Sequence, residues 1–246
     1  MPSTAGPAAC AAGAAAVSGS IAASRMRGRR RRSIAGAYDA EIPRDVQSPA
    51  MNVYHRAGTG RPIRVLWTLE EIGVPYELTV LTAEEMQQED YLRIQPLGRA
   101  PGFVGDDGPL FESSAICLHL AEAYPDAGLL PAAGTYERAQ VYQWVFFAMT
   151  EIEPPMLEIW HHREAAPQIV DGLLERAQAA VDVLESAIGG REFLVGDRLS
   201  VADIIAARVA GFIPAVGAGE LGPNVQAYIE RHAQRPAIQR ALAKVA

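Results

Sequence analysis

The sequence predicts an α/β domain followed by an all-helical domain, with a low-complexity tail in front of both. Three observations predict this order. Residues 1–50 are dominated by small residues and arginine, residues 51–124 alternate short strand-like and helix-like patterns, and the chain from residue 136 onward carries apolar residues at helical spacing. The 246 residues, 49% of them apolar, suffice for one or two domains with a core. We set the boundaries at 1–50, 51–131 and 132–246.

Residues 1–50 are predicted to be a tail without a packed core. Small residues lead into the basic run RMRGRRRRS, and polar residues with two prolines follow. Such a composition buries too little apolar surface to offset the entropy lost on ordering. The segment could be an organelle-targeting sequence, an arm for RNA or a membrane surface, or an artefact of an upstream start. We favour the artefact or a cleavable, structureless tail, because Met51 stands at the first strand-like segment.

The charge and the cysteines exclude several classes of function. Residues 1–50 hold seven arginines and three acidic residues, so the remainder carries −11 of a total net charge of −7. That acidic body argues against nucleic acid as the main partner. No run approaches the roughly 18 to 20 apolar residues of a membrane helix, so we expect a soluble protein with no membrane contact. Cys10 and Cys117 form no disulfide framework, which fits a reducing cytoplasm, and the scattered histidines predict no metal site.

The α/β region is punctuated by local signals. Pro62 stands near the start of a helical pattern and Gly73 just past its end. Asp107-Gly108 is a turn pair that favours a hairpin between two short strands. In chain order we expect strand 51–55, helix 61–73, strand 75–81, a short helix 82–94 capped by Thr82, strands 100–105 and 108–112, and helix 113–124.

Pro101 opens one of these strands. A proline forfeits a hydrogen bond of the sheet, so it belongs at a strand start or an edge. A cis peptide bond before it would turn the chain sharply and leave the backbone N–H and C=O of Ala100 unpaired by the sheet. An extended ligand with peptide groups of its own could pair with them. The alternative is an ordinary trans proline at a strand start.

Glu112 and Ser113 stand where the last strand gives way to a helix. Ser113 is an N-cap candidate, and the first helical turn offers free N–H groups to an anion. Glu112 could hold an ammonium group beside it. A ligand with a carboxylate and an amine on one carbon would match the pair, while the alternative is a helix cap next to a solvated glutamate.

Several of these motifs together resemble one family. The stretch PLGRAPGFVGDDGPLFESSAICLHLAEAYP, residues 96–125, resembles the proline, hairpin and Glu-Ser region of soluble glutathione transferases, and RVLWTLEEIGVPYEL, residues 64–78, resembles their first helix and second strand. The resemblance covers residues 51–246 and leaves the tail outside. It implies a thioredoxin-like N-terminal domain, an all-α C-terminal domain and, as a co-substrate, glutathione.

The resemblance also implies roles for individual residues. Pro101 would be the family's cis-proline, with the Ala100 backbone pairing to the cysteinyl part of glutathione. Glu112 and Ser113 would hold the γ-glutamyl amine and carboxylate. Arg99 would offer charge to the glycyl carboxylate.

The residue that activates the thiol follows the first strand in this family. Counting back five residues from Arg64 gives Thr59. A hydroxyl that donates a hydrogen bond to the sulfur favours the thiolate, which lowers the thiol pKa from about 8.5. Most relatives of this kind have serine followed by another small hydroxyl residue or cysteine, whereas Gly60 follows here. With no cysteine in this loop, mixed-disulfide chemistry on the enzyme itself is not expected. The alternative is a glycine-rich turn.

The second domain is predicted to begin after the linker YPDAGLLPAAGT, residues 124–135. We expect long helices over 136–153 and 163–188 and a further helix behind a capping box of Ser200 and Asp203. In the family the electrophile binds between the domains. Its candidate wall residues are Phe147, Met149 and Trp160, each of which could equally belong to the core.

The function predicted on this basis is a cytoplasmic, homodimeric glutathione transferase of the detoxification type, acting on a small electrophilic or disulfide substrate. Two alternatives share its binding residues. One is a glutathione-dependent disulfide reductase, and the other is a non-catalytic glutathione-binding or docking module. The sequence leaves conjugation, dehalogenation, isomerisation and disulfide reduction open.

Overall fold

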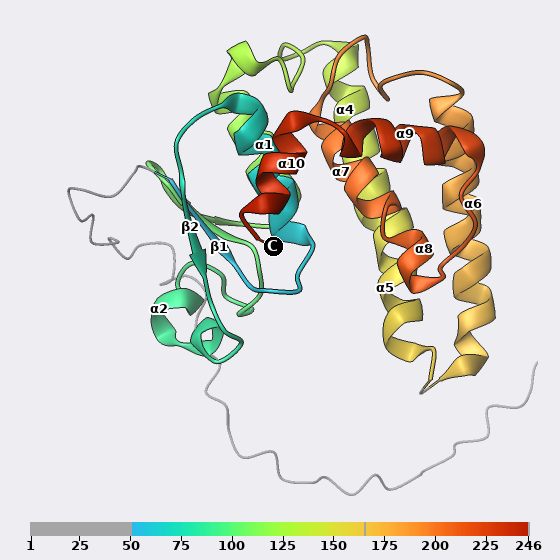
Figure 1. Cartoon of the computed structure of the whole chain (residues 1–246), viewed down its shortest axis with the longest axis horizontal. Helices are drawn as coiled ribbons and strands as arrows, with labels where there is room; N and C mark the ends of the chain where they lie inside the picture. The colour runs from blue at the N-terminus through green and yellow to red at the C-terminus, as the bar shows by residue number, and fades with distance from the viewer. Residues whose placement is uncertain (1–50, 165, 246) are drawn as a thin grey trace, which may run out of the picture. The chain divides into compact units, whose positions relative to one another are not determined.

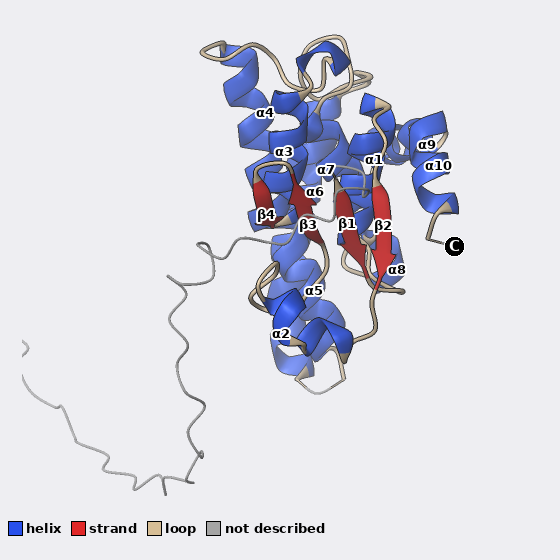
Figure 2. Ribbon diagram, turned by 90° about the vertical axis from the view of Figure 1, so that its left-hand side faces the viewer, coloured by secondary structure: helices blue, strands red, loops and turns tan. Residues whose placement is uncertain are grey.

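Four short strands form one mixed sheet in the first part of the described chain (Figure 1). The computed structural model describes residues 51–164 and 166–245, so the predicted tail, residues 1–50, lies outside the described residues. The strands are β1 (Asn52–His55), β2 (Glu77–Val80), β3 (Gly102–Gly105) and β4 (Gly108–Phe111). Their order is β2-β1-β3-β4, visible side by side in Figure 2.

The pairing of the strands fixes which ends meet. β1 runs parallel to β2, with Val53 opposite Leu78, and antiparallel to β3, with Tyr54 opposite Gly102. β3 and β4 form the predicted hairpin, in which Gly102 faces Phe111. The loop itself is Asp106-Asp107, one residue earlier than predicted, because Gly108 already pairs with Gly105 and has a φ of +117° that suits glycine.

The first helix follows its predicted signals. α1 (Arg61–Ile72) has a proline in its first turn, and Gly73 closes it in the left-handed conformation with a φ of +80°. α3 (Ser113–Ala123) packs against α1, and both helices contact the sheet. The side chains of Val53, Leu66, Phe103 and Ile116 are buried in this layer. The region is the thioredoxin-like β/α domain that the resemblance implied.

The segment predicted as one helix over 82–94 is broken. It holds a 3₁₀ turn (Glu85–Gln87) and a four-residue helix, α2 (Glu89–Leu92), separated by Gln88 in an extended conformation with ψ of 151°. The N-cap of the 3₁₀ turn is Glu84, so the prediction that Thr82 is the cap was wrong by two positions. Thr82 still holds the turn: its hydroxyl accepts from the Glu85 N–H at 3.2 Å, and the Glu85 carboxylate accepts from the Thr82 N–H at 2.7 Å.

The second part of the described chain is helical. A 3₁₀ turn (Pro125–Ala127) leads to α4 (Tyr136–Phe147), which continues through a π-helical turn (Ala148–Ile152) into α5 (Glu153–His162). Two prolines, Pro154 and Pro155, follow Glu153 directly after the π-helical turn, where their missing N–H groups interrupt the regular hydrogen-bond pattern of the continuous helix. The second long helix starts later than predicted: a 3₁₀ turn (Pro167–Ile169) precedes α6 (Val170–Ile188), because Pro167 favours a helix start and not a helix interior.

α7 (Val201–Ala210) lies at the centre of the helical domain and is almost entirely buried. The predicted capping box is present: Asp203 accepts from the Ser200 N–H at 2.9 Å. The other oxygen of Asp203 accepts from the Leu194 N–H at 2.8 Å and the Tyr228 hydroxyl at 2.9 Å. These bonds tie the start of α7 to its neighbours.

The last helices return to the first domain. α8 (Ile213–Val216) and α9 (Pro223–Ala233) lead to α10 (Pro236–Ala243), which packs along α1 (Figure 1). Arg235 forms an ion pair with Glu71 at 2.7 Å, and Arg240 and Lys244 pair with Glu70 at 2.6 and 2.8 Å. In the parts of the chain that are described, we find no helix with the length and apolarity needed to span a bilayer.

Candidate glutathione site

Three predicted segments converge at one edge of the sheet. Because β1 and β3 are antiparallel, the end of β1 lies beside the start of β3, where Tyr54 faces Gly102. Gly102 also faces Phe111 at the end of β4. The loop that carries Thr59, the Ala100-Pro101 peptide and the Glu112-Ser113 pair therefore leave the sheet at the same edge.

The Ala100-Pro101 peptide bond is cis, as the resemblance implied. Neither the N–H nor the C=O of Ala100 forms a hydrogen bond with another residue in the described ranges. Pro101 itself is buried. The backbone of Ala100 is thus open to a partner with peptide groups of its own.

Tyr91 holds the loop in front of this peptide. Its buried hydroxyl donates to the C=O of Arg99 at 2.6 Å. Burial raises the pKa of Tyr91 to about 12, so the hydroxyl stays protonated and remains a donor at neutral pH. The Arg99 N–H donates to the side chain of Gln95 at 3.2 Å, while the Arg99 side chain is exposed.

Glu112 has an unusual backbone conformation. Its φ of +71° makes it the single non-glycine residue with positive φ in the described part of the chain. Such a conformation is rare and costly for a residue with a Cβ, and it is found preferentially at functional sites. The exposed Glu112 side chain and the buried Ser113 side chain consequently leave the strand in different directions.

Ser113 is the first residue of α3, so the prediction that it is the N-cap was wrong by one position. Glu112 is the N-cap residue, and no side chain caps this helix end. The Oγ of Ser113 instead accepts a hydrogen bond from the Arg64 guanidinium at 3.2 Å. Because this bond occupies an acceptor site, the hydroxyl proton of Ser113 is left to donate to a ligand oxygen.

Arg64 connects this site to the helical domain. Its guanidinium pairs with Glu153 on α5 at 2.5 Å, and Arg61 pairs with the same carboxylate at 2.9 Å. Arg64 also donates to the sulfur of Met149 at 3.2 Å. Burial raises the pKa of Glu153, but the two arginines outweigh burial and lower it overall, so the carboxylate is ionised at neutral pH.

Thr59 lies in the turn between β1 and α1. Its hydroxyl donates to the C=O of Arg56 at 2.6 Å, and its N–H bonds the same oxygen at 3.2 Å. Gly58 before it has a φ of +76°. To donate to a ligand sulfur, the Thr59 hydroxyl would have to leave the Arg56 carbonyl.

The three predicted wall residues of the electrophile site have different surroundings. Met149 contacts Arg64 in the π-helical turn. Phe147 is partly buried and packs edge-on against Trp144, with ring centroids 5.4 Å apart. Trp160, near the end of α5, is 62% exposed. Of the three, Met149 is joined by a direct contact to the residues around Ser113.

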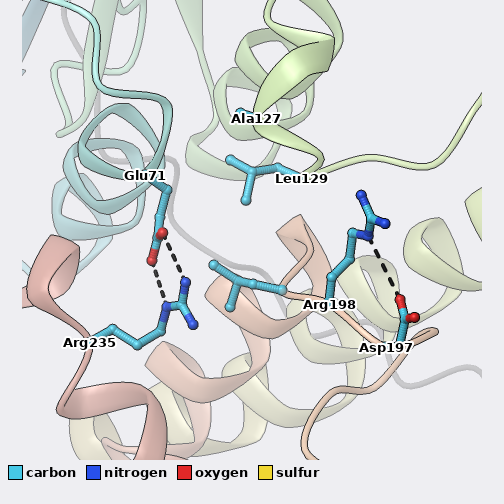
Figure 3. Close-up of a pocket in the computed structure, with 7 residues that line it drawn as sticks. Glu71, Ala127, Leu129, Asp197, Arg198 and Arg235 are labelled. Carbon is cyan, nitrogen blue, oxygen red and sulfur yellow. Dashed lines mark hydrogen bonds and ion pairs between the residues drawn. The ribbon is translucent and has the colours of Figure 1, made fainter.

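A pocket of about 370 Å³ opens elsewhere on the protein (Figure 3). Glu71, Leu129, Arg198 and Arg235 are among its lining residues, and the Glu71–Arg235 ion pair spans one side of it. Glu71 is at the C-terminal end of α1, and Thr59 precedes the N-terminal end. A helix rises about 1.5 Å per residue, so roughly 15 Å of helix separates this pocket from the site.

Sequence reasoning missed four polar residues around the site: Tyr91, Arg64 in its link to Ser113, Glu153 and Arg208. Arg208 lies on α7, and burial together with nearby Arg64 lowers its pKa to about 10. A basic residue inside the apolar run VADIIAARVA was a signal for a functional role. The contact between Arg64 and Glu153 had no such signal, because 89 positions separate them.

Comparison with known proteins identifies the family of the chain. Family models described as glutathione S-transferase, N-terminal domain, and glutathione S-transferase, C-terminal domain, match residues 49–122 and 141–236. Glutathione S-transferase F10 of Arabidopsis thaliana is 34% identical over 152 residues, which is 57% of this chain and 71% of the relative.

Two solved structures extend the likeness over most of the described chain. A glutathione transferase from Methylococcus capsulatus str. bath is 32% identical with a TM-score of 0.68, covering 79% of this chain and 98% of that one. A sphingomonad glutathione S-transferase complexed with glutathione is 25% identical with a TM-score of 0.70, again covering 79% and 98%. With both domain models matched in order and the fold shared, the chain belongs to the glutathione S-transferase family.

Proposed function

We propose that the protein is a glutathione transferase that lowers the pKa of the glutathione thiol and directs the thiolate to a small electrophile. One observation carries the proposal: the Thr59 loop, the cis Ala100-Pro101 peptide and the Glu112-Ser113 pair share one edge of the sheet. A relative of the same fold is known in complex with glutathione, which supports the choice of ligand.

Each part of glutathione has a proposed partner. The Ala100 backbone, unpaired within the described residues, binds the cysteinyl part in an extended conformation. Ser113, whose Oγ already accepts from Arg64, donates to the γ-glutamyl carboxylate, and Glu112 binds the amine. Arg99, with its exposed side chain, binds the glycyl carboxylate.

The chemistry proposed for Thr59 is hydrogen bonding to the thiolate. The hydroxyl exchanges its bond with the Arg56 carbonyl for one with the sulfur, and a hydrogen bond to the charged form lowers the thiol pKa. The thiolate then attacks a second substrate held beside it, with Met149 on the wall and Phe147 and Trp160 as further candidates. By its family we also propose a cytoplasmic homodimer with a detoxifying role.

One alternative has an observation in its favour. The Thr59 hydroxyl is already bonded to the Arg56 carbonyl at 2.6 Å, an arrangement that suits a glutathione-binding module without catalysis. In that case glutathione would bind with its thiol pKa near the free value.

The test is the ultraviolet absorbance of the thiolate of bound glutathione, titrated against pH with the full chain. We expect the bound thiol to ionise at least one pH unit below free glutathione in the parent and in Thr59→Ser, which keeps the hydroxyl. Thr59→Ala should bind glutathione but lose the shift. Binding with an unshifted thiol in the parent would favour the non-catalytic module, and a full shift in Thr59→Ala would exclude Thr59 as the activating residue.

A further inference from the structure

Arg208 is an unneutralised cation inside the helical domain. It is the half-buried position of α7, whose other residues are buried. Its Nε is buried without a hydrogen-bond partner, and no acidic group among the described residues lies within ion-pair distance of it. A buried charge without a partner is costly, and proteins seldom keep one without a function.

The surroundings of Arg208 are already rich in positive charge. Arg64 is close enough to lower the pKa of Arg208, and Arg61 lies one helical turn before Arg64 on α1. Glu153 is the carboxylate that pairs with both arginines of α1. Three guanidinium groups against one carboxylate leave a positive excess, which favours the entry of an anion.

Phe212 extends from Arg208 to the Thr59 loop. The Arg208 guanidinium lies 5.4 Å from the centre of the Phe212 ring, which is 37% exposed. The far edge of that ring is so close to Gly60 that a Cβ added there would stand 2.8 Å from it. Gly60 directly follows Thr59, so the edge of an aromatic ring borders the loop proposed to hold the thiolate, and the Arg208 guanidinium lies over the same ring.

We propose that Arg208 binds a carboxylate on the second substrate, whose planar part packs on Phe212 while the thiolate at Thr59 attacks it. The inference rests on the proposed function and gives its substrate a chemical class: electrophiles that carry a carboxylate. That carboxylate can belong to an organic electrophile, such as a halogenated nitrobenzoate, or to a second glutathione within a mixed disulfide with another thiol. The guanidinium is suited to either because it binds carboxylates through two parallel N–H groups.

Both reactions balance with the groups present. With a chloronitrobenzoate, the thiol proton goes to solvent, sulfur bonds to the carbon that bears chlorine, and chloride leaves with the electron pair of the C–Cl bond. With a mixed disulfide of glutathione and another thiol, the thiolate bonds to the glutathione sulfur, the S–S bond breaks, and the other thiol leaves as a thiolate, so that glutathione disulfide is the product. The substrate carboxylate is unchanged in each case, so Arg208 acts on binding and orientation.

The experiment compares two substrates that differ in charge. The kcat/KM for 4-chloro-3-nitrobenzoate and for 4-chloro-3-nitrobenzamide is measured for the full-length parent and for Arg208→Gln, Arg208→Lys and Arg198→Gln. In Arg208→Gln, the kcat/KM for the benzoate should fall about tenfold or more, as expected for losing a charged hydrogen bond, while the kcat/KM for the benzamide should fall less than about twofold. Arg208→Lys should retain part of the benzoate rate. Arg198→Gln removes a charge that is 73% exposed and should change neither.

Further measurements separate the possible failures. Three results for Arg208→Gln would overturn the inference while leaving the proposed function intact. They are an equal fall in kcat/KM for both substrates, no fall for either, and a rise in the KM for glutathione alone. A second pair, the mixed disulfide of glutathione and 2-mercaptoethanol against neutral 2-hydroxyethyl disulfide, identifies the source of the carboxylate by the pair on which Arg208→Gln is selective.

Calorimetric binding of S-hexylglutathione to the parent tests the proposed function separately. Binding with turnover and an unchanged benzoate-to-benzamide ratio in Arg208→Gln would sink the assignment of Arg208 alone. No binding and no turnover would end both proposals. Because Arg208 has no ionic partner in the described chain and its burial is costly, we expect Arg208→Gln to unfold at or above the parent temperature, and this measurement excludes misfolding as the cause of a loss.

Discussion

Glu153→Gln should strongly destabilise the protein, because Glu153 is the carboxylate that neutralises Arg64. The Arg64 and Glu153 side chains are 3% and 5% exposed. Removing one partner of a buried ion pair leaves an uncompensated charge and costs about 3–5 kcal/mol. For a domain of this size, 1 kcal/mol corresponds to about 2–4 °C, so the midpoint of thermal unfolding should fall by roughly 6–20 °C.

The assay is urea unfolding followed by tryptophan fluorescence, with thermal unfolding as a second measure. Glu151→Gln is the matched control, since Glu151 is two residues away and its pair with Arg176 is about half exposed at 3.6 Å. A pair of that kind contributes at most about 1 kcal/mol. A loss below 1 kcal/mol for Glu153→Gln, or equal losses for the two variants, would refute the assignment of a buried, charge-neutralising role.

Lowering the pH should reduce the difference in unfolding free energy between the parent and Glu153→Gln. The pKa of Glu153 is lowered in the folded protein because the charges of Arg64 and Arg61 outweigh the effect of burial. A carboxyl with a lowered pKa stabilises the fold above its unfolded pKa of about 4.3, and this stability is lost as the pH falls through the folded pKa. The two unfolding curves should therefore differ most above about pH 5 and approach each other at lower pH.

Three further outcomes follow from buried groups. Tyr91→Phe leaves the Arg99 carbonyl without its donor, so stability should fall by about 1–3 kcal/mol and the KM for glutathione should rise, as read from urea unfolding and initial rates. Burial and two neighbouring arginines lower the pKa of His232 to about 4 in the folded protein, against 6.5 in the unfolded chain. The unfolded chain therefore binds the proton first, and stability is lost as the pH falls from about 6.5 to 4. In His232→Phe, the unfolding free energy should no longer fall by the order of 3 kcal/mol between these pH values. An unchanged pH profile of unfolding would exclude His232 as the source of the parent's loss of stability. Burial raises the pKa of Cys117 to about 12, so in a Cys10→Ser background the native protein should react with a thiol reagent far more slowly than the same protein in 6 M guanidinium; equal rates would mean that Cys117 is accessible.

Local signals predicted the parts of the fold that depend on local chemistry. Pro62 and Gly73 set the ends of α1, and Ser200 with Asp203 set the start of α7, because the groups involved are within a few residues of each other. The helix predicted over 82–94 failed, since nothing in its polar sequence announced the extended conformation of Gln88.

The candidate site likewise has parts that the local sequence predicted and parts that it did not. The positions of Pro101, Glu112 and Ser113 could be read from their order along the chain, and their convergence followed once the strands were paired. The ionic link between Arg64 and Glu153 could not, because it depends on how α5 packs against α1, and no local pattern specifies that packing.

The packing of α10 along α1 has a consequence for synthesis on the ribosome. Arg235 pairs with Glu71, although 164 positions separate them, and Arg240 reaches Glu70 across 170. The outer side of α1 therefore stays uncovered while the whole helical domain is translated. At typical rates of about 5–20 residues per second, this takes on the order of ten seconds or more, during which that side of α1 lacks its partner helix. A chain arrested before residue 236 would lack the helix that covers α1, and quality-control proteases could recognise it by that exposed surface.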